Sequence, residues 1–144
     1  MNNGLFSSEN DTWATPPELF RKLDAEFRFT LDVCALPENA KCDRYFTPND
    51  DGLAQPWDGI CWMNPPYGSA ISKWMHKAYS EHVERRLTIV CLVPARTDTR
   101  WCHDYAMKGE IRFIRKRIRF VGGRSCVPFL SAIVIYRDRW WEGQ

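Results

Sequence analysis

The stretch Ile60-Cys61-Trp62-Met63-Asn64-Pro65-Pro66-Tyr67 joins a short apolar run to a rigid corner. The two adjacent prolines fix φ and remove two backbone donors, so this corner cannot continue a sheet or a helix. Asn64 adds a side-chain carbonyl, and Tyr67 adds a flat ring. Acceptor oxygens beside an aromatic face predict a pocket for a planar group that carries an amine.

The segments around this corner alternate between strand and helix patterns, which predicts an α/β fold. We expect one doubly wound, mostly parallel sheet that ends in an antiparallel C-terminal hairpin. Residues 12–144 should form a single domain after a flexible N-terminus, 1–11, which leaves little chain for a separate target-recognition domain. Thr15 is expected to cap a helix that begins at Pro16. The expected strands are 29–34, 44–47, 59–63, 87–93, 111–120 and 128–136, and further helices are expected from 71 and over 99–107.

Charge and cysteine spacing narrow the class of protein. The net charge is only +2, but basic residues crowd the last third of the chain, where they alternate with apolar ones. Such a run suits phosphate binding, and it also suits the solvated face of an edge strand. The 6 cysteines contain no Cys-x-x-Cys pair, which argues for reduced thiols and against a metal site. With no apolar run long enough to span a bilayer and no signal peptide, we expect a cytoplasmic protein.

Several further segments occur in an order that resembles the phage-type Dam family of DNA N6-adenine methyltransferases, over roughly residues 11 to 137. They are Trp13-Ala14-Thr15-Pro16, Leu31-Asp32-Val33-Cys34-Ala35, Asp51-Gly52-Leu53 with Trp57, Leu92-Val93-Pro94-Ala95-Arg96 and Arg117-Ile118-Arg119-Phe120. The resemblance implies a Rossmann-like methyltransferase fold. It also implies methyl transfer from S-adenosylmethionine to the N6 amine of adenine in double-stranded DNA, in a bacterial or phage-infected cell.

The same resemblance implies a set of cofactor-binding residues: Trp13, Thr15, Asp32, Cys34, Ala35, Asp50 and Asp51. The chain lacks a Gly-x-Gly-x-x-Gly loop, the usual mark of nucleotide-type cofactors. Other readings of these positions stay open. Asp32 also suits a cap for the turn after its strand, and the two adjacent aspartates also suit an ordinary turn. Phe46 suits either stacking on the cofactor's adenine or a place in the core.

The resemblance assigns catalysis to Asn64, Pro65, Pro66 and Tyr67. The Asn64 side-chain oxygen and the Pro65 carbonyl would accept the two amine protons, while Tyr67 stacks on a base that has flipped out of the duplex. Phe120 resembles a second aromatic wall, although it also suits a strand core. Phosphate contacts are expected from Arg96, Arg100, Arg117 and Arg119.

Other functions fit the same residues. An N4-cytosine DNA methyltransferase would use the same pocket, and RNA or protein-glutamine amino methyltransferases carry related signatures. A catalytically inactive DNA-binding module would keep the fold without the cofactor, as the missing glycine loop allows. In so short a chain, target recognition would rest on loops or on the second subunit of a homodimer.

Overall fold

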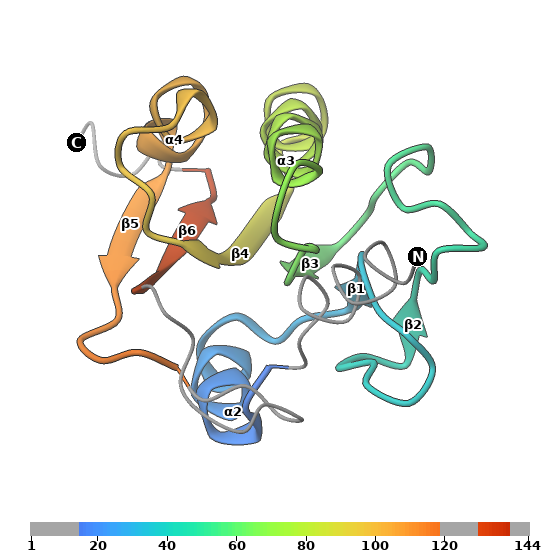
Figure 1. The fold of residues 1–144 in the computed structure, drawn as a ribbon. Coiled ribbons are helices and arrows are strands. Elements are labelled where there is room, and N and C mark those ends of the chain that lie inside the picture. Colours follow the sequence, from blue (N-terminus) through green and yellow to red (C-terminus); the bar gives the residue numbers. More distant parts are fainter. Residues whose placement is uncertain (1–14, 119–129, 139–144) are drawn as a thin grey trace, which may run out of the picture.

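A six-stranded sheet forms the centre of the protein, in the order β2-β1-β3-β4-β6-β5. A computed structural model describes residues 15–118 and 130–138 (Figure 1). The strands are β1 (Leu31–Asp32), β2 (Arg44–Tyr45), β3 (Ile60–Met63), β4 (Thr88–Pro94), β5 (Glu110–Phe113) and β6 (Ser131–Tyr136). The pairs β2–β1, β1–β3 and β3–β4 are parallel, whereas β6 runs antiparallel to both β4 and β5.

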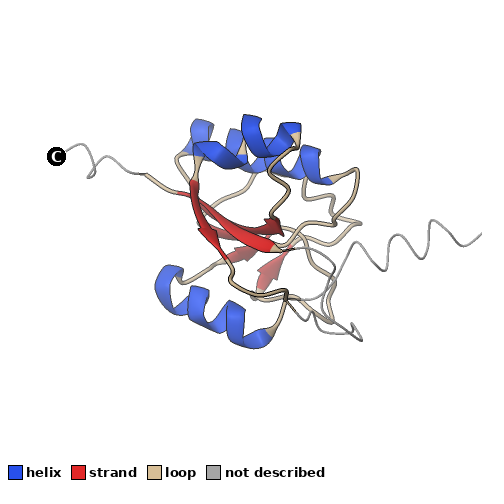
Figure 2. Ribbon diagram, turned by 60° about the vertical axis from the view of Figure 1, so that its left-hand side comes forward, coloured by secondary structure: helices blue, strands red, loops and turns tan. Residues whose placement is uncertain are grey.

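Helices cover both faces of this sheet. Helix α2 (Pro17–Phe27) lies on one face, and α3 (Ile71–Arg85), α4 (Arg100–Asp104) and the short 3-10 helix η1 (Ala106–Lys108) lie on the other (Figures 1 and 2). The central strands β3 and β4 are almost fully buried, as expected for a sheet covered twice. The prediction of a mostly parallel α/β sheet with an antiparallel C-terminal pair is therefore confirmed. No helix of the described residues is both long and apolar enough to cross a bilayer.

The strand expected over 111–120 is much shorter in the structure. It ends at Phe113, which pairs with Ala132, and the last bond of the ladder joins the Ile114 N–H to the Ser131 carbonyl. Because its partner strand begins at Ser131, the chain beyond Ile114 finds no backbone partners in the sheet. The prediction is therefore wrong for residues 114–118, and 119–120 lie outside the described residues.

The start of the first helix also differs from the prediction. Pro16 occupies the N-cap position, and the helix begins at Pro17. No side chain caps this end. Thr15 instead lies before the helix, 2% exposed, and its hydroxyl accepts a hydrogen bond from Asn64. The capping role predicted for Thr15 is therefore wrong, because the hydroxyl is used in a long-range contact.

Four charged side chains join helix α2 to the last two strands, and we call them the ion-pair cluster: Glu26, Glu110, Arg112 and Arg137. Both Glu26 oxygens accept from Arg112 at 2.7 Å, and Glu110 accepts from Arg112 at 3.1 Å and from Arg137 at 2.7 Å. The bidentate bond to Arg112 holds the pKa of Glu26 below its ordinary value. The cluster therefore fixes the edge strand β5 against α2.

Candidate active site

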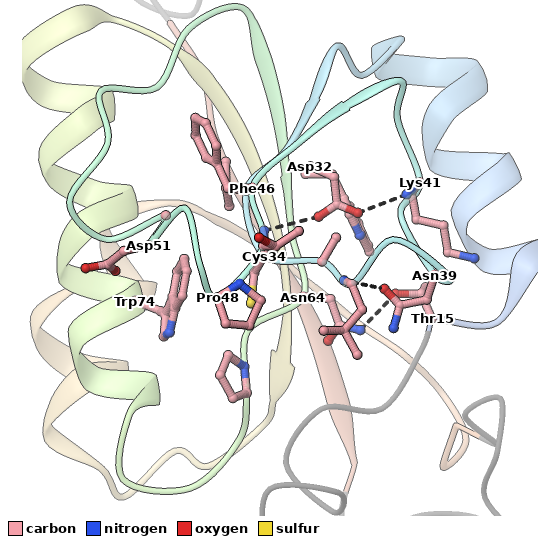
Figure 3. A pocket seen from close by; sticks show the side chains of 17 residues that line it. Thr15, Asp32, Cys34, Asn39, Lys41, Phe46, Pro48, Asp51, Asn64 and Trp74 are labelled. Atoms are coloured by element: carbon pink, nitrogen blue, oxygen red, sulfur yellow. Dashed lines mark hydrogen bonds between the residues drawn. The ribbon is translucent and has the colours of Figure 1, made fainter.

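One cavity of about 280 Å³ opens where β1 and β3 end. This is the edge at which open α/β sheets bind their ligands. In Figure 3, polar side chains gather on one side of it and aromatic side chains on the other. The lining residues are Thr15, Asp32, Val33, Cys34, Ala35, Leu36, Asn39, Lys41, Phe46, Thr47, Pro48, Asp51, Gly52, Trp62, Asn64, Pro66 and Trp74.

Asp32 supplies a buried carboxylate to the polar side. It is the last residue of β1 and only 2% exposed. One oxygen accepts from the Cys34 N–H at 3.2 Å and the other from the Lys41 N–H at 3.0 Å, so the residue does cap the turn after its strand. Burial raises the pKa of Asp32 from 3.8 to about 6, against the opposing effect of these two bonds. At neutral pH the cavity therefore holds a desolvated negative charge, which favours a cationic ligand group.

Asn64 reaches the same cavity from the end of β3. Its Nδ2 donates to Thr15 Oγ1 at 2.9 Å, so a residue at the start of the described chain orients the amide of the proline corner (Figure 3). The neighbouring Pro66 also lines the cavity. Because the amide nitrogen donates to Thr15, the Oδ1 atom is the acceptor that Asn64 can offer to a ligand.

The remaining corner residues lie behind the cavity. Pro65 is buried, and Tyr67 is 8% exposed. Neither belongs to the cavity lining. Burial raises the pKa of Tyr67, and the nearby Ser131 side chain at the start of β6 opposes this effect. Tyr67 therefore braces the corner against β6, and a ligand can reach only a small part of its ring.

The aromatic side of the cavity is formed by Phe46 and Trp74, with Asp51 beside them (Figure 3). Trp57 supports this side from behind, because its ring stacks on Trp74 at 6.5 Å and its Nε1 donates to the Gly52 carbonyl at 2.8 Å. A Cβ atom at Gly52 would lie 2.3 Å from a backbone oxygen and 3.0 Å from the Trp74 ring. This contact explains why glycine follows Asp51.

Five of the seven residues expected to bind a cofactor line this one cavity: Thr15, Asp32, Cys34, Ala35 and Asp51. Asp50 does not line it, because its carboxylate turns back to accept from the Thr47 N–H at 2.8 Å and the Thr47 hydroxyl at 3.1 Å. Trp13 lies outside the described residues.

Of the cations expected to contact phosphate, Arg96, Arg100 and Arg117 are exposed. Arg96 follows β4, and Arg100 begins α4. Arg119 and Phe120 lie outside the described residues. Arg112, which belongs to the basic run of the sequence, is held in the ion-pair cluster and is therefore a structural residue.

Several cavity residues carried no recognisable signal in the sequence. Trp74 has the helical spacing of a core residue, and it is indeed buried. Asn39 and Lys41 lie in the turn between β1 and β2, where Asn39 Oδ1 accepts from the Leu36 N–H at 2.9 Å. Only the position of Asn39 and Lys41 in the turn that follows Asp32 would have indicated them as cavity residues. No three His, Cys, Asp or Glu side chains of the described chain group as metal ligands.

Fold and cavity together define an α/β protein with a small cavity at the carboxyl ends of parallel strands, beside an Asn-Pro-Pro-Tyr corner. The model of the DNA N-6-adenine-methyltransferase (Dam) family matches residues 3–128. The chain belongs to this family, and it is a methyltransferase enzyme.

Two curated relatives agree with this assignment. The DNA N-6-adenine-methyltransferase of Haemophilus phage HP1 (strain HP1c1) is 36% identical over 124 residues, which cover 82% of this chain and 70% of the relative. "Putative methyltransferase YfdM" of Escherichia coli (strain K12) is 37% identical over 65 residues, which cover 40% of this chain and 71% of the relative.

Proposed function

We propose that this enzyme transfers a methyl group from S-adenosylmethionine to the N6 amine of adenine at specific sites in double-stranded DNA. The observation that carries this proposal is that one cavity is lined both by the buried Asp32 carboxylate and by Asn64 of the proline corner. A binding group for a cation and an acceptor for an amine therefore line the same small space. The name of the phage HP1 relative supports adenine as the base.

The cavity residues fit this cofactor. The desolvated Asp32 carboxylate suits its ammonium group, and Phe46 and Trp74 offer flat surfaces to its adenine. Asp51 is exposed at the rim, where its carboxylate can accept from ribose hydroxyls. When bound, the cofactor supplies an electrophilic methyl group on a positively charged sulfur. Because Gly52 has no side chain, the aromatic side of the cavity stays open for the adenine ring of the cofactor.

The proline corner activates the amine. The lone pair of an exocyclic aromatic amine is delocalised into the ring, so the nitrogen is a poor nucleophile. Asn64 Oδ1 and the Pro65 carbonyl accept hydrogen bonds from its two N–H groups, which draws the nitrogen toward tetrahedral geometry and localises the lone pair. Because Pro65 is buried outside the cavity lining, its carbonyl reaches the amine only when the corner opens. After the transfer, the positively charged nitrogen releases one of its two protons to water. Positioning and electrostatics then lower the barrier. A covalent intermediate is not needed, and burial raises the pKa of the nearby Cys34 thiol to about 12, which keeps it protonated.

DNA reaches this corner by base flipping. Because only 8% of Tyr67 is exposed, stacking on the base requires the corner to open when DNA binds. Arg96, Arg100 and Arg117 lie exposed and can contact phosphates, and we keep Arg119 and Phe120 in the same roles. Recognition within one domain, 12–144, falls to the loops at this edge of the sheet, or to a homodimer.

Two measurements test the proposal. Calorimetry with S-adenosylmethionine should show binding to the wild type, and labelled methyl groups should enter unmethylated DNA and be recovered as N6-methyladenine after digestion. Asn64→Ala should remove most of the transfer, whereas Asn49→Ala, an exposed asparagine outside the cavity, should transfer normally. Recovery of N4-methylcytosine would show that the target base is cytosine and not adenine. An absence of cofactor binding at millimolar concentration would instead favour an inactive DNA-binding module.

A further inference from the structure

Two large apolar side chains lie exposed at the carboxyl edge of the sheet, on the side away from the cavity. Phe113 ends β5 and is 68% exposed, and Leu130 directly precedes β6 and is 51% exposed. Exposed phenylalanine and leucine side chains that lie together mark an interaction surface more often than single exposed ones do. We call these two residues the apolar pair.

The strand register places the two side chains next to each other. Phe113 pairs with Ala132, and Leu130 is two residues before Ala132, so both side chains point to the same face of the sheet. Diagonal neighbours of this kind are within reach of an aromatic ring. Arg112 points to the opposite face, where it binds Glu26 of α2. The apolar pair therefore faces the side of the sheet that carries α3 and α4.

Exposed cations surround the apolar pair. The Leu130 carbonyl accepts from the Ala95 N–H, which brings the pair beside the loop that leads from β4 to α4. The exposed basic residues of the two adjoining segments, 94–100 and 114–118, are Arg96, Arg100, Arg115, Lys116 and Arg117. Asp98 is the acidic residue of these two segments. The charge of this edge is thus complementary to a polyanion.

The distance between the proline corner and the apolar pair is short enough for one DNA duplex to contact both. Asn64 directly follows β3, and Phe113 ends β5, which is three strands away in the order β3-β4-β6-β5. At about 4.8 Å between strands, the two residues are separated by roughly 14 Å across the sheet. This span equals about four base-pair steps at ~3.4 Å each. A duplex that presents a base to Asn64 and runs along this edge toward β5 therefore reaches the apolar pair within a few base pairs.

We propose that Phe113 and Leu130 form an apolar contact with sugar and base edges in a groove of the bound duplex, a few base pairs from the flipped adenine. The surrounding cations take the phosphates, and the pair sets the position of the duplex over the corner. This inference rests on the proposed function, which supplies DNA as the substrate. A second copy of the chain is the rival occupant of the same surface.

The salt dependence of binding separates an apolar contact from a phosphate contact. Phe113→Ser and Leu130→Ser should each weaken duplex binding about tenfold, the effect of losing most of a buried apolar side chain. The slope of log K against log salt should stay unchanged, because no counterion is involved, whereas Lys116→Gln should reduce that slope by about one. Phe113→Leu should keep most of the affinity.

Val83→Ser and Met107→Ser are matched controls, since these side chains are 57% and 58% exposed at other places on the surface. Both should bind DNA like the wild type. The probe is a labelled duplex of about three helical turns. It carries the sequence that the wild type methylates, or a mixed sequence if the wild type methylates none, so binding is measured whether or not the proposed function holds. Cofactor affinity of the Phe113 variant should be unchanged.

Normal duplex affinity in both serine variants would overturn the inference while leaving the methyl-transfer assay of the wild type untouched. A change from dimer to monomer in sedimentation, with duplex affinity per subunit unchanged, would assign the apolar pair to self-association instead. A loss of affinity equal in the Val83 and Met107 controls would also overturn it, because the effect would then not be specific to this edge.

Discussion

Replacing Asp32 by asparagine removes the one buried charge of the cavity and should change how stability depends on pH. The carboxylate is 2% exposed, and burial raises its pKa from 3.8 to about 6. Between these two pH values the native state binds more protons at Asp32 than the unfolded state does. The contribution of Asp32 to the free energy of unfolding therefore falls as pH rises through that interval. Above pH 6 the ionised carboxylate destabilises the native state by about 3 kcal/mol.

The difference between variant and wild type isolates this effect from other carboxylates, such as Glu26, whose pKa is lowered by Arg112. The free energy of unfolding of Asp32→Asn, minus that of the wild type, should increase by roughly 2–3 kcal/mol between pH 4 and pH 7. At neutral pH the net change should be small. The amide has a single acceptor oxygen, so one backbone N–H loses its partner at a cost of about 1–3 kcal/mol.

Urea unfolding, followed through the fluorescence of the buried tryptophans and repeated at several pH values, measures this difference. Ligand binding should respond in the opposite direction. S-adenosylmethionine should bind the wild type more weakly as pH falls below about 6, and bind Asp32→Asn weakly throughout. A stability difference that stays constant from pH 4 to pH 7 would refute the reasoning, because it would show that Asp32 titrates like a solvated carboxyl group.

Gly52→Ala should lower the free energy of unfolding by about 1–3 kcal/mol and weaken cofactor binding, since its Cβ would lie 2.3 Å from a backbone oxygen. A variant with the unfolding free energy and the cofactor affinity of the wild type, measured by denaturation and calorimetry, would contradict the close contact. Thr15→Val should reduce methyl transfer about tenfold by releasing the Asn64 amide, with Thr15→Ser restoring it; equal rates for valine and serine would show that the hydroxyl does not orient Asn64. A double-mutant cycle of Arg112→Met and Glu26→Gln should give a coupling of about 0.5–1 kcal/mol that decreases at high salt, and a coupling near zero would make this contact energetically neutral.

The sequence predicted the arrangement of the sheet because its strong signals are local. The uncharged run that became β4 and the proline corner after β3 each fix their own structure. Ile71, Trp74 and Met75 have the spacing of one helix face, and α3 buries that face. These features follow from periodicity and from proline chemistry, which act over a few residues.

The cavity depended on contacts between distant segments, and here the sequence was less informative. Thr15 carries the pattern of a helix cap, yet its hydroxyl bonds to Asn64 from 49 positions away. Trp74 resembles a core residue and also lines the cavity, and Asp50 resembles its neighbour Asp51 but turns back onto Thr47. Spacing alone does not distinguish two adjacent aspartates. The left-handed φ of 57° at Asp51 is what directs the two side chains differently.

The ion-pair cluster has a consequence for synthesis on the ribosome. Glu26 is made early, and the two arginines that hold it, Arg112 and Arg137, emerge much later. Helix α2 packs on Trp62 through Phe20, but its anchor to β5 and β6 forms only after both strands have been made. This delays part of its docking, although domains usually begin to fold from the N-terminus during translation. A nascent chain arrested before Arg137 should remain open to protease at α2, and release of the full segment should close it in one cooperative step.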